Sequence, residues 1–206
     1  MNDRRHQIVA AAYDLLEADG LEGLTIRSVL ARTGLARRAF YERFATKDDL
    51  VLAVFEQTLS DAAAAFTRMV AALDNPVDGL RLIVTQIVLG QVGQERAATE
   101  GAPAPTGRRA AALAREHLRL ADARPAELNR AIAPLVQVIR DRLVAAMAAG
   151  VARRADPERM ALLVYNLVSN TTHGRLIAEE QGASEVHERA MLAQEIWDFC
   201  RHAILT

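Results

Sequence analysis

The stretch TIRSVLARTGLARRAFYERFATK, residues 25–47, combines two short helical patterns with a dense cluster of positive charge. Its basic side chains are Arg27, Arg32, Arg37, Arg38, Arg43 and Lys47. With Glu42 as the single acid, these six bases give the stretch a formal charge of +5, whereas the whole chain carries −1. Gly34 lies between the two patterns and can adopt the positive φ that a tight turn after a helix needs. We therefore predict two short helices joined by a turn, with a basic exposed side.

Local signals place both helices. Thr25 is a good N-cap, and Leu24 and Val29 have the spacing of a hydrophobic staple around it. The first helix should end near Arg32, and the second should run over residues 37–44 with Phe40 and Phe44 on its buried face. The exposed face would then hold Arg37, Arg38, Tyr41 and Glu42. This pattern predicts a helix-turn-helix of the DNA-binding kind.

Composition limits the protein class. At 206 residues, 51% hydrophobic and 25% charged, the chain suits a folded protein of one large or two small domains. Abundant Ala and Leu and only 4% aromatic residues favour an all-α fold. Because the net charge is −1, affinity for nucleic acid must come from a patch. The single cysteine, Cys200, excludes an internal disulfide and a cysteine zinc site. The start MNDRRHQ lacks the apolar core of a signal peptide, so a cytoplasmic protein without a membrane partner is expected.

About nine helices are expected in all. The first covers residues 3–19 and stops at Gly20, and a long one begins with the capping residues Thr46 and Asp49 and reaches Leu73. The others are expected near residues 75–90, 108–121, 125–150, 157–182 and 184–204, with a loop over 98–107. Pro134 should kink the helix that contains it or mark the start of its main segment.

Residues 4–55 closely resemble the DNA-binding domain of the tetracycline-repressor (TetR) family of bacterial transcription regulators. The positions at family spacing are Gly20, Thr25, Gly34, Tyr41, Phe44 and Lys47. The resemblance implies a DNA-binding domain over residues 1–47 and an effector-binding and dimerisation domain over 48–206. It further implies a ligand-responsive regulator, most often a repressor, that binds a palindromic operator as a homodimer. A small hydrophobic or amphipathic effector would release it from DNA.

The family pattern also assigns DNA contacts. Base-reading positions correspond to Arg27, Arg37 and Arg38, and arginine pairs with the O6 and N7 atoms of guanine. Phosphate-binding positions correspond to Thr25, Tyr41, Arg43 and Lys47, which would set register without reading sequence. Three positions depart from the family: Ala36 replaces the usual Ser at the start of the second helix, Arg38 replaces a common Gly, and Leu30 replaces a small residue.

The sequence also offers candidate residues for the effector pocket and the dimer interface. Asn166, Asn170 and His173 share one helix face, which could line a pocket, lie in the dimer interface or be satisfied internally. Further pocket candidates, each also compatible with ordinary core packing, are Met69, Gln86, His117, Val138 and Tyr165. The dimer candidates are Gly174, Leu192, Ile196, Trp197, Phe199 and Cys200, for which packing within one chain is the alternative.

Other function classes have less support. The chain has no HExxH motif, no glycine-rich phosphate loop and no nucleophile elbow, so we expect no enzyme, no cofactor and no metal site. The alternative that remains is a non-regulatory ligand-binding or scaffolding protein of the same fold, with only weak non-specific DNA binding.

Overall fold

The computed structural model describes residues 3–90, 108–180 and 186–206, and these residues form nine α-helices and no β-strand, which confirms the all-α prediction. The helices are α1 (Asp3–Gly23), α2 (Ile26–Thr33), α3 (Arg37–Tyr41), α4 (Lys47–Ala71), α5 (Pro76–Leu89), α7 (Arg108–Ala123), α8 (Pro125–Ala148), α9 (Pro157–Glu180) and α10 (Val186–Ile204). The predicted loop over residues 98–107 lies outside the described residues.

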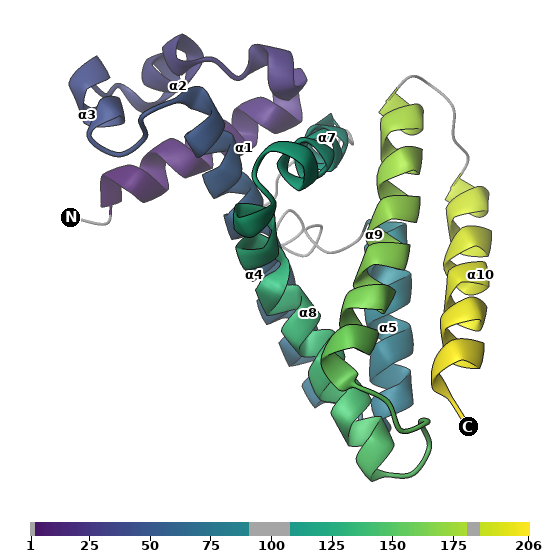
Figure 1. Cartoon of the computed structure of the whole chain (residues 1–206). Helices are drawn as coiled ribbons and strands as arrows, with labels where there is room; N and C mark the ends of the chain where they lie inside the picture. The colour runs from purple at the N-terminus through teal and green to yellow at the C-terminus, as the bar shows by residue number, and fades with distance from the viewer. Residues whose placement is uncertain (1–2, 91–107, 181–185) are drawn as a thin grey trace.

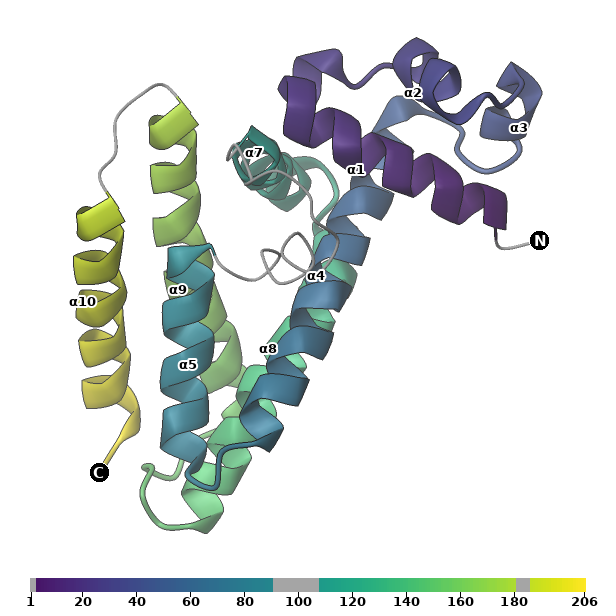
Figure 2. The ribbon, with the colours of Figure 1, turned by 180° about the vertical axis from the view of Figure 1, so that it is seen from behind.

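The molecule has a small head and a longer body. Helices α1, α2 and α3 form the head, and α4 leaves it to run beside α8 to the far end (Figure 1). Helices α5, α9 and α10 complete the body, with α10 packed against α5 (Figure 2). Helix α7 connects the two parts, because it packs against α1 in the head and against α9 in the body.

Side-chain caps fix three helix starts where the sequence predicts them. The Thr25 Oγ1 accepts a 3.0 Å hydrogen bond from the Ser28 N–H, and the Ser28 hydroxyl accepts one of 2.9 Å from the Thr25 N–H. Thr46 and Asp49 make the same reciprocal pair at the start of α4, at 3.0 and 3.1 Å. The Asn75 side chain caps α5 through the Val77 N–H at 2.9 Å. These bonds satisfy donors that a helix start leaves free.

Three boundaries differ from the expected ones. The chain leaves helical geometry at Gly20, as predicted, but another turn follows and α1 reaches Gly23. Helix α3 has only five residues and ends at Tyr41 rather than Phe44. Helix α8 continues through Pro134, whose side chain is exposed. The helix tolerates the hydrogen bond lost at this proline because its opposite face packs against α4 and α9.

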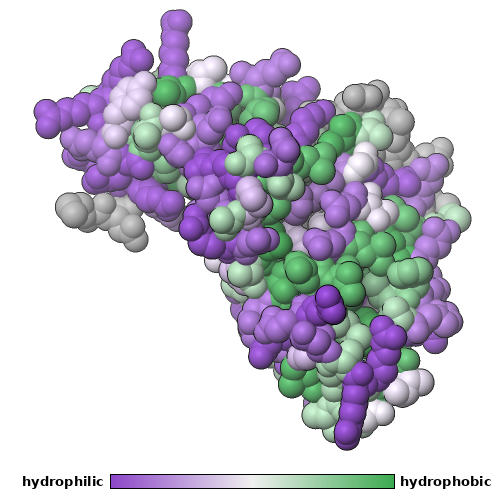
Figure 3. All heavy atoms as spheres, in the orientation of Figure 1, coloured by the Kyte–Doolittle hydropathy of each residue, from purple (hydrophilic) through white to green (hydrophobic). Residues whose placement is uncertain are grey.

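The core runs the length of α4. Ten of its residues are buried, among them Leu50, Phe55 and Phe66. Helix α4 is long and apolar enough to cross a membrane by length and composition, but half of its most apolar window is buried, as in a core helix. The surface divides in the same way as the fold, since the head is mainly hydrophilic and hydrophobic side chains gather over the body (Figure 3).

Candidate nucleic-acid interface

Helices α2 and α3 are held in a fixed relation by the turn between them. Gly34 ends α2 with a φ of 68°, a left-handed conformation that glycine adopts without strain. Behind the turn, Phe40 is fully buried and its ring centroid lies 5.7 Å from that of Phe44. The Arg5 guanidinium lies 5.6 Å from the Phe44 ring, so the start of α1 reaches this core. The exposed face of α3 is therefore supported from below by packed aromatic rings.

The predicted base-reading arginines all lie on the exposed side. The Arg38 side chain is 91% exposed and pairs with Glu42 at 3.1 Å. The Arg37 Nη2 donates a 3.3 Å hydrogen bond to the Tyr41 hydroxyl, which raises the pKa of the arginine. Arg27 is exposed on α2. Among the described residues, the partners of Arg37 and Arg38 are four positions away, Tyr41 in α3 and Glu42 just after it. Both arginines can therefore turn toward a ligand at small cost.

The predicted phosphate-binding residues lie at or near the ends of the helices of this region. Thr25 lies at the start of α2, Tyr41 at the end of α3 and Lys47 in the first turn of α4. Arg43 follows α3 and donates to the Glu42 carbonyl at 3.3 Å. Ala36 precedes α3 and provides no side-chain cap, as its chemistry predicts.

One basic residue of the stretch has a structural contact instead. Arg32 pairs with Asp14 on α1 at 3.1 Å and so joins α2 to α1. Gln7 adds a second connection, because its Nε2 donates to the Thr33 carbonyl at 3.1 Å. The sequence did not reveal the Arg32 contact, since the two partners are 18 positions apart.

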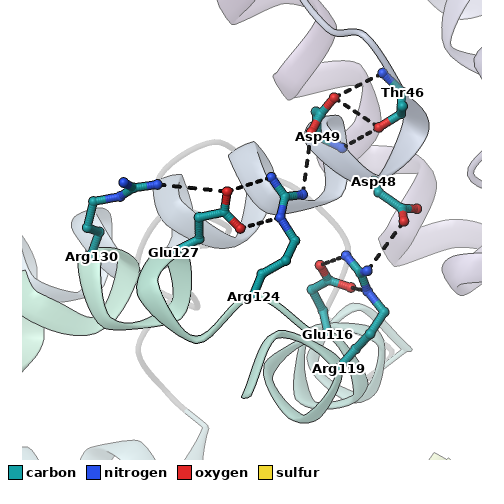
Figure 4. A network of polar contacts seen from close by, with 8 residues as sticks. All are labelled: Thr46, Asp48, Asp49, Glu116, Arg119, Arg124, Glu127 and Arg130. Atoms are coloured by element: carbon teal, nitrogen blue, oxygen red, sulfur yellow. Dashed lines mark hydrogen bonds and ion pairs between the residues drawn. The ribbon is translucent and has the colours of Figure 1, made fainter. Parts of the chain in front are cut away.

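A network of charges joins the start of α4 to α7 and α8 (Figure 4). Arg119 on α7 contacts Asp48 at 3.3 Å and Glu116 at 2.7 Å. Arg124 lies 3.4 Å from Asp49 and also pairs with Glu127, which contacts Arg130 at 3.9 Å.

Hydrogen bonds in this network shift the pKa values of its members. The bond from Thr46 is the main cause of the lowered pKa of Asp49, and Arg124 adds to it. The bond with Glu116 raises the pKa of Arg119. Because Asp48 follows Lys47 directly, the network joins the edge of the helix-turn-helix head to the body. No sequence signal identified these partners.

A second polar cluster lies inside the body. His117 on α7 and His173 on α9 have ring centroids 4.5 Å apart, and Tyr165 on α9 lies 6.1 Å from His117. Phe55 on α4 faces His117 edge-on at 6.0 Å. The structure thus brings together three of the predicted pocket residues. Burial lowers the pKa of His173 to about 4, with the neighbouring His117 as a second cause. Burial also raises the pKa of the Tyr165 hydroxyl.

The other pocket candidates lie elsewhere. Asn166 and Asn170 are exposed on the outer side of α9, so the predicted polar stripe divides and only His173 faces the histidine cluster. Met69, Gln86 and Val138 are partly buried on α4, α5 and α8.

The predicted dimer residues also separate into two groups. Ile196, Trp197 and Cys200 are buried within this chain, where burial raises the pKa of the Cys200 thiol to about 11. Leu192 packs partly against the same core. Phe199 is 66% exposed, and a Cβ placed on Gly174 would meet nothing within 4 Å.

Three further large apolar side chains on α9 and α10 are exposed and were not among the predicted dimer residues. Leu162 and Leu163 lie on α9, and Met191 lies on α10. The sequence pattern did not identify them, because α9 and α10 carry apolar residues on more than one face and spacing alone does not show which face is exposed.

Comparisons with known proteins agree with this arrangement. Residues 8–54 match the family described as bacterial regulatory proteins, tetR family. The HTH-type transcriptional regulator HbdR from Aromatoleum sp. (strain CIB) is 28% identical over 80 residues, which are 39% of this chain and 35% of that protein. The match therefore spans about a third of that relative.

Two solved structures share the fold over nearly the whole chain. The transcriptional regulator FadR from Bacillus subtilis, in complex with stearoyl-CoA, has a TM-score of 0.69 at 12% identity and aligns over 95% of this chain and 96% of its own. A putative transcriptional regulator from Saccharomonospora viridis, in complex with choline, has a TM-score of 0.70 at 16% identity over 100% of both chains. Residues 8–54 therefore match the helix-turn-helix region of the tetR family of bacterial regulatory proteins, and the chain as a whole shares its fold with these solved regulators.

Proposed function

We propose that the protein is a homodimeric repressor that binds a palindromic operator and leaves it when a small hydrophobic or amphipathic effector binds. The observation that carries this proposal is the pair Arg37 and Arg38, exposed on a helix whose opposite face is anchored by Phe40. A helix held in this way can enter the major groove, where its long donors read base edges.

The dimer assignment depends on the exposed apolar side chains of α9 and α10. Leu163 is 64% exposed, Phe199 66% and Met191 53%, which are the three highest exposed fractions among the large apolar side chains of the described residues. Gly174 leaves room for close approach of another helix on α9. A second copy of the chain would cover this surface and hold two recognition helices at a fixed spacing, as a palindromic site requires.

The effector response is proposed to travel through α4. Lys47 lies at its head end, and Phe55, two turns further on, contacts His117 in the body. The pairs that Asp48 and Asp49 make with Arg119 and Arg124 couple the same helix start to α7 and α8. An effector that prefers one placement of α4 would change the separation of the recognition helices, by no more than its difference in affinity for the two states.

A gel-shift assay with DNA from upstream of the protein's own gene tests the DNA-binding part. We expect Arg37→Ala to relax sequence preference, with a loss of about 1–3 kcal/mol on the preferred site, and Lys47→Ala to weaken all sequences alike. Arg154→Ala is the control, because it removes an exposed positive charge far along the chain, in the loop after α8. If native protein binds only in a salt-labile, sequence-independent way, the non-regulatory alternative is favoured.

Sedimentation of a Leu163→Asp variant tests the dimer. A buried carboxylate on this surface should convert a dimer to a monomer, whereas Leu118→Asp, an exposed change on α7, should not. A native protein that sediments as a monomer would contradict this part of the proposal.

A further inference from the structure

We propose that His117 and His173 form the polar end of the effector site, and that they select a neutral molecule that carries a hydroxyl group on an apolar body. This inference rests on the regulatory function proposed above and names the chemical class of its effector.

The two rings are supplied by different helices and contact each other directly. His117 comes from α7 and His173 from α9, with centroids 4.5 Å apart. Phe55 of α4 and Tyr165 of α9 lie about the His117 ring at 6.0 and 6.1 Å. A molecule bound here would touch the three helices that meet between head and body, among them the helix that begins at Lys47.

Both imidazoles contain a buried nitrogen without a hydrogen-bond partner. The Nδ1 atoms of His117 and His173 are inaccessible to solvent, and no described residue accepts from or donates to them. His117 is only 5% exposed. A buried polar atom left unpaired is unfavourable, and an apolar side chain of similar size would avoid this penalty. The two nitrogens are explained if a bound molecule supplies the missing partner.

The chemistry of the pair favours an uncharged partner. Burial keeps both imidazoles neutral at pH 7, and a neutral imidazole offers one donor and one acceptor. A hydroxyl group also donates and accepts, so it can satisfy one nitrogen of each ring. Glu116, the nearest carboxylate along α7, is held by Arg119 at 2.7 Å and does not provide a counter-charge for a cation.

Metal binding is a poorer match to these residues. Within residues 3–90, 108–180 and 186–206, no group of three or more His, Cys, Asp or Glu side chains has the geometry of a metal site. The aromatic rings of Phe55 and Tyr165 suit an apolar or aromatic body next to the hydroxyl.

Four aromatic probes of similar size test the assignment on the native 206-residue chain. Phenol, toluene, benzoate and benzyltrimethylammonium share one ring and differ in their polar group. Dissociation constants come from NMR titration of the histidine ring signals, for which the exposed His6 and His202 serve as internal references. We expect phenol to bind about tenfold more tightly than toluene, the ratio for one hydrogen bond of ordinary net strength. Phenol should shift the signals of His117 and His173 more than those of the references.

Two variants locate the effect. His173→Phe and His117→Phe keep the ring shape and remove the nitrogens, so each should lower the phenol-to-toluene ratio toward one. His202→Phe is the matched control and should leave the ratio unchanged. If one variant fails to fold, the other variant and the ring shifts of the native protein still show whether phenol binds at the histidine pair.

Several results would overturn the inference. They are equal binding of phenol and toluene, tightest binding of benzoate or of benzyltrimethylammonium, and ring shifts confined to His6 and His202. None of these measurements involves DNA, so a failed gel shift would contradict the regulatory function alone. Phenol binding at the histidine pair with no effect on a sequence-specific gel shift would contradict its role as an effector site.

Discussion

The helix-turn-helix face and the interior of the body both contain clustered polar side chains, but these differ in charge and in burial. On the head, Arg37 and Arg38 are charged and exposed, and their partners among the described residues are neighbours one turn away. In the body, His117 and His173 are neutral and buried, and they contact each other. Exposed charge suits a long polyanion, whose phosphates attract it through water. Buried neutral donors and acceptors suit a small neutral molecule that carries a hydroxyl group on an apolar body, because hydrogen bonds gain strength where water is excluded.

The charge network of Figure 4 lies between these two regions, and its side chains are charged like those of the head but partly buried like those of the body. Arg119 is charged like the head arginines, but its side chain is only 39% exposed and it holds the buried Glu116. The network therefore stabilises the fold, whereas Arg37 and Arg38 remain available for a ligand. The predictions below test this contrast, beginning with the largest expected effect.

Removing the support beneath the DNA-binding face should have the largest effect on stability. Phe40 is fully buried, so Phe40→Ala should lower the free energy of unfolding by about 3–5 kcal/mol. Urea unfolding followed by circular dichroism measures the change. Val144→Ala is the control, because this side chain is 42% exposed and its truncation should change stability by less than about 0.5 kcal/mol. Equal effects from both variants would show that the face has no core of its own.

Acid should weaken the body through His173. Its pKa in the folded protein, about 4, is below the ordinary value of 6.5, so the unfolded chain takes up a proton first as the pH falls. The stability it contributes is complete above about pH 6.5 and declines as the pH drops toward 4. Between pH 7 and pH 5 the loss should be roughly 2 kcal/mol, at 1.36 kcal/mol per unit. His117, whose pKa burial also lowers, acts in the same direction.

Unfolding curves at both pH values check this effect. His173→Phe should flatten the decline, and the exposed His6→Phe should leave it as in the native protein. If His173→Phe shows the native decline, His173 is not a buried neutral group in solution.

Disrupting the charge network of Figure 4 should have an intermediate effect on stability. Arg119→Ala leaves the Glu116 carboxylate buried without its main partner, so stability should fall by about 1–3 kcal/mol. Combining it with Glu116→Gln should recover part of the loss, since the buried charge is then removed. Arg130→Ala, at a side chain 71% exposed with one long contact, should change stability by less than about 0.5 kcal/mol. A loss from Arg130→Ala as large as that from Arg119→Ala would remove the distinction between network and surface charge.

The smallest effect is a gain at the start of α3. Ala36 has the extended backbone of an N-cap but no side-chain oxygen, so Ala36→Ser should raise stability by about 0.5–1 kcal/mol. Ala39→Ser, inside the same helix, adds the same hydroxyl without a cap and should be slightly destabilising. A comparison of urea midpoints checks both, and a gain from Ala39→Ser with none from Ala36→Ser would contradict the capping argument.

The head could be predicted from the sequence in most of its detail. The caps at Thr25 and Thr46 and the turn at Gly34 depend on residues a few positions apart, so their geometry follows from local rules. The buried Phe40 and the exposed Arg37 follow from helical spacing in the same way. The body was less predictable, because α9 and α10 carry apolar residues on more than one face and spacing alone could not show which face each residue occupies.

The sequence by itself determined the all-α class, the helix-turn-helix and the charge on its exposed side, because short-range capping, turn chemistry and periodicity specify these features. Only the tertiary structure decided which distant residues meet. It joined His117 to His173, Arg119 to Asp48 and Arg32 to Asp14, and it separated His173 from the exposed Asn166 and Asn170. The physical reason is that such pairs form only when helices far apart in the chain pack against one another, and this packing depends on the shape of the whole core.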